Sequence, residues 1–366
     1  MKNNIFQFAT SELSQDAFIC WLANGFNCDN EQLKQLAIEF VQKVSGVDNV
    51  RRVEIYRQYQ SIDVLLIVND VVAVIIEDKT FTGEHDNQIE RYKKVIQDDQ
   101  KYSKCTVRTV FLKTGFMYDD DRATKQRVEQ DGGLAIDRAC FIEILSRYQG
   151  KCNSEILDDY YQMLLELDDK DSKKGQYYKF VEDSNSEWNI SCYDIAQYKL
   201  MREFFPDEQN DYIYHGSSSG RPWTEHVIHK GKHEEYALFW RIDTDSKGPY
   251  VSLRVYPEDK CFNKNDNKIM EINLERYKRY SDYAKEYFEQ LQSPVTWEWS
   301  IVYPGWRGGY REAAIITYHL QDALRDWNNA KDGVVQNIRR ISEDLKKIGC
   351  EIDEKMNVDE SIFRKS

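Results

Sequence analysis

The stretch from Ser61 to Lys79 most constrains the fold, because its pattern predicts two apolar strands joined by a tight turn. The first strand begins at Asp63, and the second ends on Glu77, Asp78 and Lys79. Charged side chains near a core cost free energy unless they are paired or bind a metal. The charges at this end of the hairpin therefore indicate either an ion-pair network or a metal site.

The position of Asp63 relative to Glu77 depends on the register of the hairpin. Side chains alternate along a strand, so Glu77 and Lys79 share a face. Asp63 joins them only if it is paired with Glu77 in the antiparallel ladder. That pairing needs an odd number of residues in the turn at 69–71, whereas a two-residue turn would pair Asp63 with Ile76. If these charges form one functional site, the turn is therefore predicted to be a three-residue loop or to contain a bulge.

The composition is that of a globular protein with room for two domains. The chain has 366 residues, of which 41% are hydrophobic and 31% charged. We find no run of about 18 apolar residues and no apolar leader, so we expect a cytoplasmic protein without a membrane segment. The eight cysteines contain no C-x-x-C pair, which favours reduced thiols. The net charge of -13 argues against general coating of nucleic acid but allows a local basic groove.

The first domain is placed at residues 1–168. The expected elements are helices over 11–25 and 29–45, strands over 50–59, 62–68 and 71–78, a helix over 84–98, a strand over 106–112, and helices near 121–130, 139–148 and 153–167. This order predicts a mixed sheet with a crossover helix.

A charged stretch at 167–175 is the candidate linker, and the composition beyond it becomes richer in aromatic residues. The second domain is placed at residues 176–366. Its expected elements are helices over 193–205, 274–292 and 319–347, and strands over 224–230, 236–243, 249–256 and 312–318. They predict an α+β domain with an antiparallel sheet.

The acids of the hairpin suit a metal-dependent reaction. Two carboxylates and a backbone carbonyl form a hard oxygen site that suits Mg²⁺, with Mn²⁺ as a substitute. Such an ion neutralises a scissile phosphate and lowers the pKa of a bound water. Lys79 would position the attacking water or help to deprotonate it.

These residues resemble the PD-(D/E)XK nuclease superfamily. Asp63, thirteen intervening residues and Glu77-x-Lys79 lie on the second and third strands of an expected αβββαβ core, and the resemblance covers residues 1–165. It implies a restriction-endonuclease-like fold, metal binding by Asp63 and Glu77, and water activation by Lys79. Ile62 stands where the family name places a proline.

Two further matches extend the resemblance. It implies that Glu12, in the first helix, is an additional metal-linked acid, and that Gln88 with Tyr92 one turn later is the family's Q-x-x-x-Y element near the site. Glu12 has an alternative as a first-turn acid favoured by the helix dipole. Gln88 and Tyr92 have an alternative as a solvated pair. Asp78 is expected to face solvent or to be paired locally.

Two features of the second domain are candidate sites. The glycine-rich loop 303–311 contains Trp306 and Arg307, which could stack on bases and bind phosphate, or could belong to an ordinary surface turn. His226, His229 and His233 have a spacing close to that of metal ligands. In a regular strand His226 and His229 face opposite ways, so a structural role is expected.

The chain is thus predicted to be a Mg²⁺-dependent endonuclease that hydrolyses phosphodiester bonds. By resemblance DNA is the expected substrate, and defence of a bacterium against foreign DNA is a fitting role. The alternative is a non-catalytic protein that keeps the nuclease fold and binds a partner or nucleic acid; a small-molecule enzyme centred on the second domain is a third reading. In the first two, the second domain would bind substrate, sense a ligand or mediate oligomerisation, for example as a homodimer.

Overall fold

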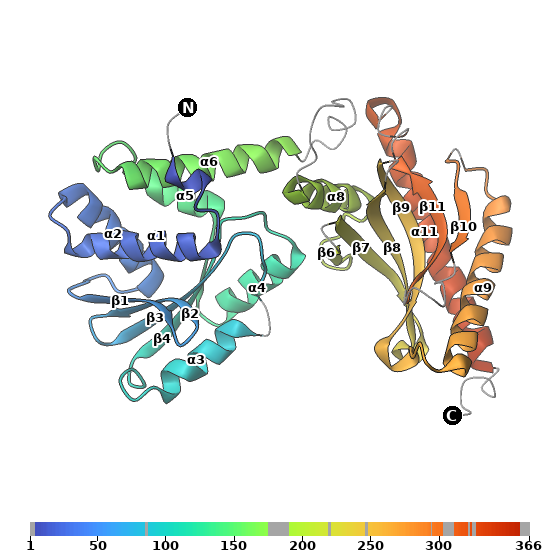
Figure 1. Cartoon of the computed structure of the whole chain (residues 1–366), viewed down its shortest axis with the longest axis horizontal. Helices are drawn as coiled ribbons and strands as arrows, with labels where there is room; N and C mark the ends of the chain where they lie inside the picture. Colours follow the sequence, from blue (N-terminus) through green and yellow to red (C-terminus); the bar gives the residue numbers. More distant parts are fainter. Residues whose placement is uncertain are drawn as a thin grey trace. The chain divides into compact units, whose positions relative to one another are not determined.

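The computed structural model describes residues 4–84, 87–174, 190–218, 221–245, 248–293, 295–302, 311–320, 323 and 327–358. The chain divides into two compact units, Met1–Lys173 and Lys174–Ser366, and each is described by itself (Figure 1). The boundary falls within the predicted linker, but that stretch is not a loop, because helix α6 continues to Lys174. Asp168 and Asp169 are exposed on this helix, whereas Asp171 is buried and pairs with Arg138 at 2.6 Å.

Unit 1 contains a mixed five-stranded sheet in the order β1-β2-β3-β4-β5. The strands are β1 Val53–Tyr59, β2 Ile62–Val68, β3 Val72–Lys79, β4 Thr106–Lys113 and β5 Leu134–Asp137. The pairs β1–β2 and β2–β3 are antiparallel, and the pairs β3–β4 and β4–β5 are parallel. The predicted mixed sheet is confirmed. The fifth strand was not predicted, since its four residues are too few to show a period.

Helices cover both faces of this sheet (Figure 1). They are α1 Glu12–Asn24, α2 Glu31–Ser45, α3 Gln88–Asp98, α4 Asp119–Gln130, α5 Arg138–Ser146 and α6 Glu155–Lys174. Residues of α1, α2, α5 and α6 share one apolar core with the sheet, whereas α3 and α4 pack on the opposite face. Burial on both faces explains why β2 and β3 are almost continuously apolar.

The loop between β2 and β3 contains three residues, 69–71, as the register prediction requires. Asn69 and Asp70 have positive φ values of 53° and 62°, a conformation that asparagine and aspartate tolerate better than most residues. Asp63 therefore lies opposite Glu77, one residue beyond the last pair of the ladder. The predicted register is confirmed.

Unit 2 is an α+β domain with a six-stranded antiparallel sheet in the order β10-β11-β9-β8-β7-β6, as predicted. The strands are β6 Ile213–Ser218, β7 Arg221–Lys230, β8 Tyr236–Asp245, β9 Gly248–Pro257, β10 Glu298–Val302 and β11 Ala313–His319, and the helices are α8 Ile190–Phe204, α9 Asn267–Glu289 and α11 Trp327–Val358. The edge strands β6 and β10 were not predicted. None of the described helices has both the length and the apolar character needed to cross a membrane.

Gly115, just after β4, allows the chain to pass against the end of β3. A Cβ atom at this position would lie 1.6 Å from the carbonyl oxygen of Thr80. We expect Gly115→Ala to lower the free energy of unfolding by about 2 kcal/mol or more, because the backbone must shift to make room. The measurement is urea denaturation followed by circular dichroism.

Gly333→Ala in α11 is the matched control, because a Cβ atom there meets nothing within 4 Å. Its unfolding free energy should stay unchanged or rise by up to about 1 kcal/mol, since alanine is the better helix former. Equal stability of Gly115→Ala and the unsubstituted chain would contradict the close packing of the β3 and β4 ends.

Candidate functional site

Asp63, Glu77 and Lys79 meet at one end of the central hairpin. Lys79 Nζ lies 2.5 Å from Glu77 Oε1 and 3.6 Å from Asp63 Oδ2. The Glu77 side chain is 0% exposed and that of Lys79 8%, whereas Asp63 is 17% exposed. The side-chain alternation of β3 and the hairpin register together account for this arrangement. Solvent therefore reaches the group mainly at Asp63.

Asp63 also belongs to a second acidic group, with Asp16 from α1 and Asp78 from β3. Carboxylate oxygens of the three residues lie within 4.8 Å of one another. Gln58 Nε2 donates to Asp16 Oδ2 at 2.9 Å and to Asp63 Oδ1 at 3.3 Å. The backbone N–H of Asp78 donates to Asp63 Oδ2 at 3.3 Å. Asp63 is thus shared by the groups formed on the two faces of β3.

Asp16 and Asp78 were not predicted as site residues. Asp78 is 1% exposed, so the solvent-facing alternative is wrong; it is paired, but with Gln15 of α1, whose Nε2 donates to Asp78 Oδ2 at 2.8 Å. Asp16 lies four residues after Glu12 and hence on the same face of α1. That spacing could have suggested Asp16, whereas the burial of Asp78 depends on the packing of α1 over β3.

Glu12 contacts the chain that follows β3. Its Oε1 accepts hydrogen bonds from Thr82 Oγ1 at 2.7 Å, Thr80 N at 3.1 Å and Thr82 N at 3.4 Å. Burial opposes ionisation of Glu12, but the bonds from Thr82 and Thr80 and the charge of Lys79 outweigh it and lower its pKa. Glu12 therefore holds the segment after Lys79, and Asp16 is the acid of α1 that approaches Asp63.

Gln88 and Tyr92 lie on α3, on the face of the sheet that Glu77 and Lys79 occupy. Gln88 Nε2 donates to the Tyr92 hydroxyl at 3.3 Å. Tyr92 is 5% exposed and packs in an apolar cluster, so the alternative of a solvated pair does not hold for it. Burial raises the pKa of Tyr92, and the negative charges of Glu77 and Asp63 also raise it. The pair therefore lies within electrostatic reach of the acids.

Burial and mutual repulsion make the acids of the site hard to ionise. Burial raises the pKa of Glu77 to about 7, and the charge of Asp63 adds to the rise while Lys79 opposes it. Burial also raises the pKa of Asp63. The pKa of Asp78 is well above its usual range because of burial and the adjacent Asp16 carboxyl. Burial alone would lower the pKa of Lys79, but attraction by the Glu77 and Asp63 carboxylates outweighs this effect and raises the pKa.

The site has the donor set that a hard divalent cation prefers. Glu77 Oε2, Asp16 Oδ1 and Asp78 Oδ1 are buried without a hydrogen-bond donor. Buried oxygens of this kind normally have a partner, and carboxylate oxygens are the usual ligands of Mg²⁺ and Mn²⁺. In the part of the chain that the structure describes, the Asp16, Asp63 and Asp78 group is the one cluster of possible metal ligands. These residues therefore fit a divalent cation.

His226 and His229 in unit 2 do not form such a cluster. A bulge in β7 inserts one residue between their ladder positions, so both point to the same face, and the expectation of opposite faces is wrong. Each has its own acidic neighbour, Asp211 at 3.4 Å for His226 and Asp353 at 4.0 Å for His229. The expected structural role agrees with these contacts.

Comparison of the chain with family models, curated proteins and solved structures gives no match. Interpretation of the site therefore depends on its own geometry and chemistry. Of the predicted site residues, the structure brings Asp63, Glu77 and Lys79 together and places Glu12 and Tyr92 beside them. The predicted substrate contacts Trp306 and Arg307 lie outside the described residues.

The raised pKa of Glu77 predicts a pH dependence of stability. Its pKa rises from 4.5 in the unfolded chain to about 7 in the folded one, so the folded state binds the proton more tightly. The stabilisation is full below pH 4.5 and is lost as the pH rises through 7. In Glu77→Gln, the loss of unfolding free energy between pH 5 and 7.5 should be smaller than in the unsubstituted chain, measured by urea denaturation with EDTA present.

The matched control for this measurement is Glu143→Gln, because the Glu143 side chain is 69% exposed. Its change of stability with pH should equal that of the unsubstituted chain. If Glu77→Gln also showed an unchanged pH dependence, the buried acidic character of the site would be refuted.

Proposed function

We propose that unit 1 is a metal-dependent endonuclease that hydrolyses phosphodiester bonds of DNA, with a restriction-endonuclease-like core of the PD-(D/E)XK type. The β2–β3 register carries the proposal, because it sets Asp63 opposite Glu77 with Lys79 close to both. The order of two antiparallel steps, a crossover helix and a parallel strand agrees with such a core.

Asp63 and Glu77, set opposite each other by the register, would hold the Mg²⁺ or Mn²⁺ ion. Asp16 and Asp78, which cluster with Asp63, would complete the ligand set or add negative charge beside the ion. A bound ion would supply charge neutralisation at the scissile phosphate and a bound water of lowered pKa. Asp63, the most exposed of the three central side chains, would face the substrate. The buried acids would be kept ionised by the cation in place of the protons that their raised pKa values favour.

Lys79 would act as a cation rather than as a base. Its pKa is raised by Glu77 and Asp63, so its ammonium group keeps its proton at neutral pH. A fixed ammonium can donate to the attacking water and offset the charge that develops on the phosphate. Glu12 would keep the chain after Lys79 in place through Thr80 and Thr82.

One observation favours a second candidate, a non-catalytic protein that keeps this fold and binds a partner or nucleic acid. Glu77 is wholly buried and its carboxylate is paired with Lys79 at 2.5 Å. Such an ion pair can stabilise the fold without a metal ion or a substrate. A net charge of -13 also disfavours broad contact with nucleic acid. In either case unit 2 would bind substrate, sense a ligand or support a homodimer, and a defence role would suit the nuclease.

Replacement of Lys79 tests the enzyme directly. Lys79→Ala should reduce Mg²⁺-dependent cleavage of plasmid DNA at least about a hundredfold, since removal of one fixed donor to developing negative charge costs that much or more. Cleavage is followed on agarose gels with plasmid, linear DNA and RNA, with Mg²⁺ or with EDTA. Circular dichroism checks the fold.

Lys93→Ala is the control for loss of a lysine near the site, because Lys93 lies on α3 and pairs with Glu90 and Asp131 at the surface. It should retain cleavage within a few fold. Full activity of Lys79→Ala would refute the proposed role of Lys79. A purified protein that cleaves none of these substrates with Mg²⁺ or Mn²⁺ would favour the non-catalytic candidate.

Metal binding gives an independent test that does not need a substrate. Isothermal titration calorimetry should detect Mn²⁺ binding to the unsubstituted chain and a loss of at least about tenfold in affinity in Asp63→Asn, because a carboxylate ligand is removed. Asp98→Asn, at the exposed end of α3, should bind as the unsubstituted chain does. Equal affinity in Asp63→Asn and Asp98→Asn would exclude Asp63 as a ligand.

A further inference from the structure

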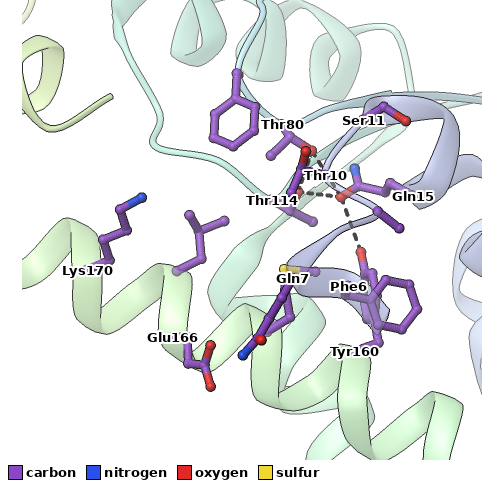
Figure 2. Close-up of a pocket in the computed structure, with 14 residues that line it drawn as sticks. Phe6, Gln7, Thr10, Ser11, Gln15, Thr80, Thr114, Tyr160, Glu166 and Lys170 are labelled. Carbon is purple, nitrogen blue, oxygen red and sulfur yellow. Dashed lines mark hydrogen bonds between the residues drawn. The ribbon is translucent and has the colours of Figure 1, made fainter. Parts of the chain in front are cut away.

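A second feature of unit 1 is a pocket of about 210 Å³ beside the acidic cluster. Four segments line it: the chain from η1 (Ile5–Gln7) into α1, the residues after β3, the residue after β4, and α6. Figure 2 shows Gln15, Thr80 and Thr114 at one end, with Glu166 and Lys170 of α6 on the other side. We call it the Gln15 pocket. None of the predicted site residues lines it.

The polar end of the Gln15 pocket has hydroxyl groups that compete for one acceptor. Gln15 Oε1 accepts from Thr114 Oγ1 at 2.5 Å, and from Thr80 Oγ1 and the Tyr160 hydroxyl at 3.2 Å each (Figure 2). An amide oxygen has two lone pairs, so it cannot serve three donors equally well. The two bonds of 3.2 Å are long for O–H···O bonds and therefore weak. Thr80 Oγ1 also lies 3.2 Å from Thr114 Oγ1, so the two threonine hydroxyls can bond to each other as well as to Gln15. An acceptor atom on a ligand could replace the weak bond from Thr80 or from Tyr160 to Gln15 at little cost.

The rest of the lining of the Gln15 pocket is mixed. Phe6, Met163 and Leu167 are apolar, whereas Glu166 and Lys170 of α6 are charged. Phe81 also lines the pocket and has 59% of its surface exposed. The chain around Phe81 is held by hydrogen bonds from the N–H groups on either side, Thr80 and Thr82, to Glu12. A single exposed aromatic ring is common on protein surfaces, so Phe81 bears on a binding site because it lines the pocket together with Phe6.

The size and the donors of the pocket indicate the class of ligand. A dry cavity of about 150 Å³ is large enough for benzene, so about 210 Å³ admits a larger planar ring. We propose that the Gln15 pocket binds a planar aromatic heterocycle with a hydrogen-bond acceptor, the chemistry of a nucleobase. Its ring would lie against Phe81 and Phe6, and its acceptor would face the hydroxyls of Thr80 and Tyr160.

Gln15 connects this pocket with the acidic cluster. Its Nε2 donates to Asp78 Oδ2 at 2.8 Å, while its Oε1 faces the pocket hydroxyls. A ligand that turns the Gln15 amide would therefore change the hydrogen bonding of Asp78, and with it the group of Asp16, Asp63 and Asp78. Binding itself does not depend on nuclease activity, so it can be tested whether or not the protein cleaves DNA.

The test uses adenosine, guanosine, cytidine, uridine and thymidine as probes of the full chain, by saturation-transfer NMR and calorimetry. Leu167→Trp should block the mouth of the pocket, and Leu165→Trp, a partly exposed leucine on α6 that does not line it, is the matched control. At least one nucleoside should bind the unsubstituted chain and Leu165→Trp, and should bind Leu167→Trp at least about tenfold more weakly. Circular dichroism verifies the fold of both variants.

Tyr160→Phe provides a second variant, because it keeps the buried ring and removes the hydroxyl. It should weaken nucleoside binding several-fold. A single-stranded oligonucleotide that displaces the nucleoside would identify a base of a nucleic acid as the source, and a lack of displacement would identify a free nucleoside. The proposal is overturned if no nucleoside binds the unsubstituted chain, or if Leu167→Trp binds as tightly as Leu165→Trp.

Discussion

The register of the β2–β3 hairpin is the constraint on which the site depends. Both strands are buried on both faces, so their apolar pattern alone would tolerate a shift by one residue. The turn decides between the registers, because Asn69 and Asp70 adopt positive φ values that give a three-residue loop. A two-residue turn would preserve the apolar core but turn Asp63 away from Glu77. Turn chemistry thus fixes the meeting of the acids.

The site combines groups from both faces of β3. Glu77 and Lys79 lie on the side of α3, whereas Asp78 lies on the side of α1 with Asp16 and Gln15. Asp63, at the strand end, contacts both groups. The cost of burying these acids is only partly offset by Lys79, since several of their oxygens have no donor. A bound divalent cation would supply the missing positive charge and would bind the oxygens that have no donor. Metal binding and catalysis are therefore proposed together.

The sequence predicted what depends on local patterns and missed what depends on packing. The order of strands and helices follows from apolar periodicity, whereas the odd turn was predicted from the requirement that Asp63 and Glu77 meet on one face. The participation of Asp16 and Asp78 follows from the packing of α1 over β3, which no local pattern reveals. Strand β5 is too short to show a period, and the bulge at His229 breaks the alternation from which its orientation was predicted.

The most direct test of the account is the position of a bound ion. A crystal of the full chain soaked in Mn²⁺ can be measured by anomalous diffraction, which locates manganese independently of any assumption about the site. The account predicts an anomalous peak in direct contact with the carboxylates of Asp63 and Glu77, with Asp16 and Asp78 close by. A well-diffracting crystal with no peak there, or with manganese bound only elsewhere, would contradict it.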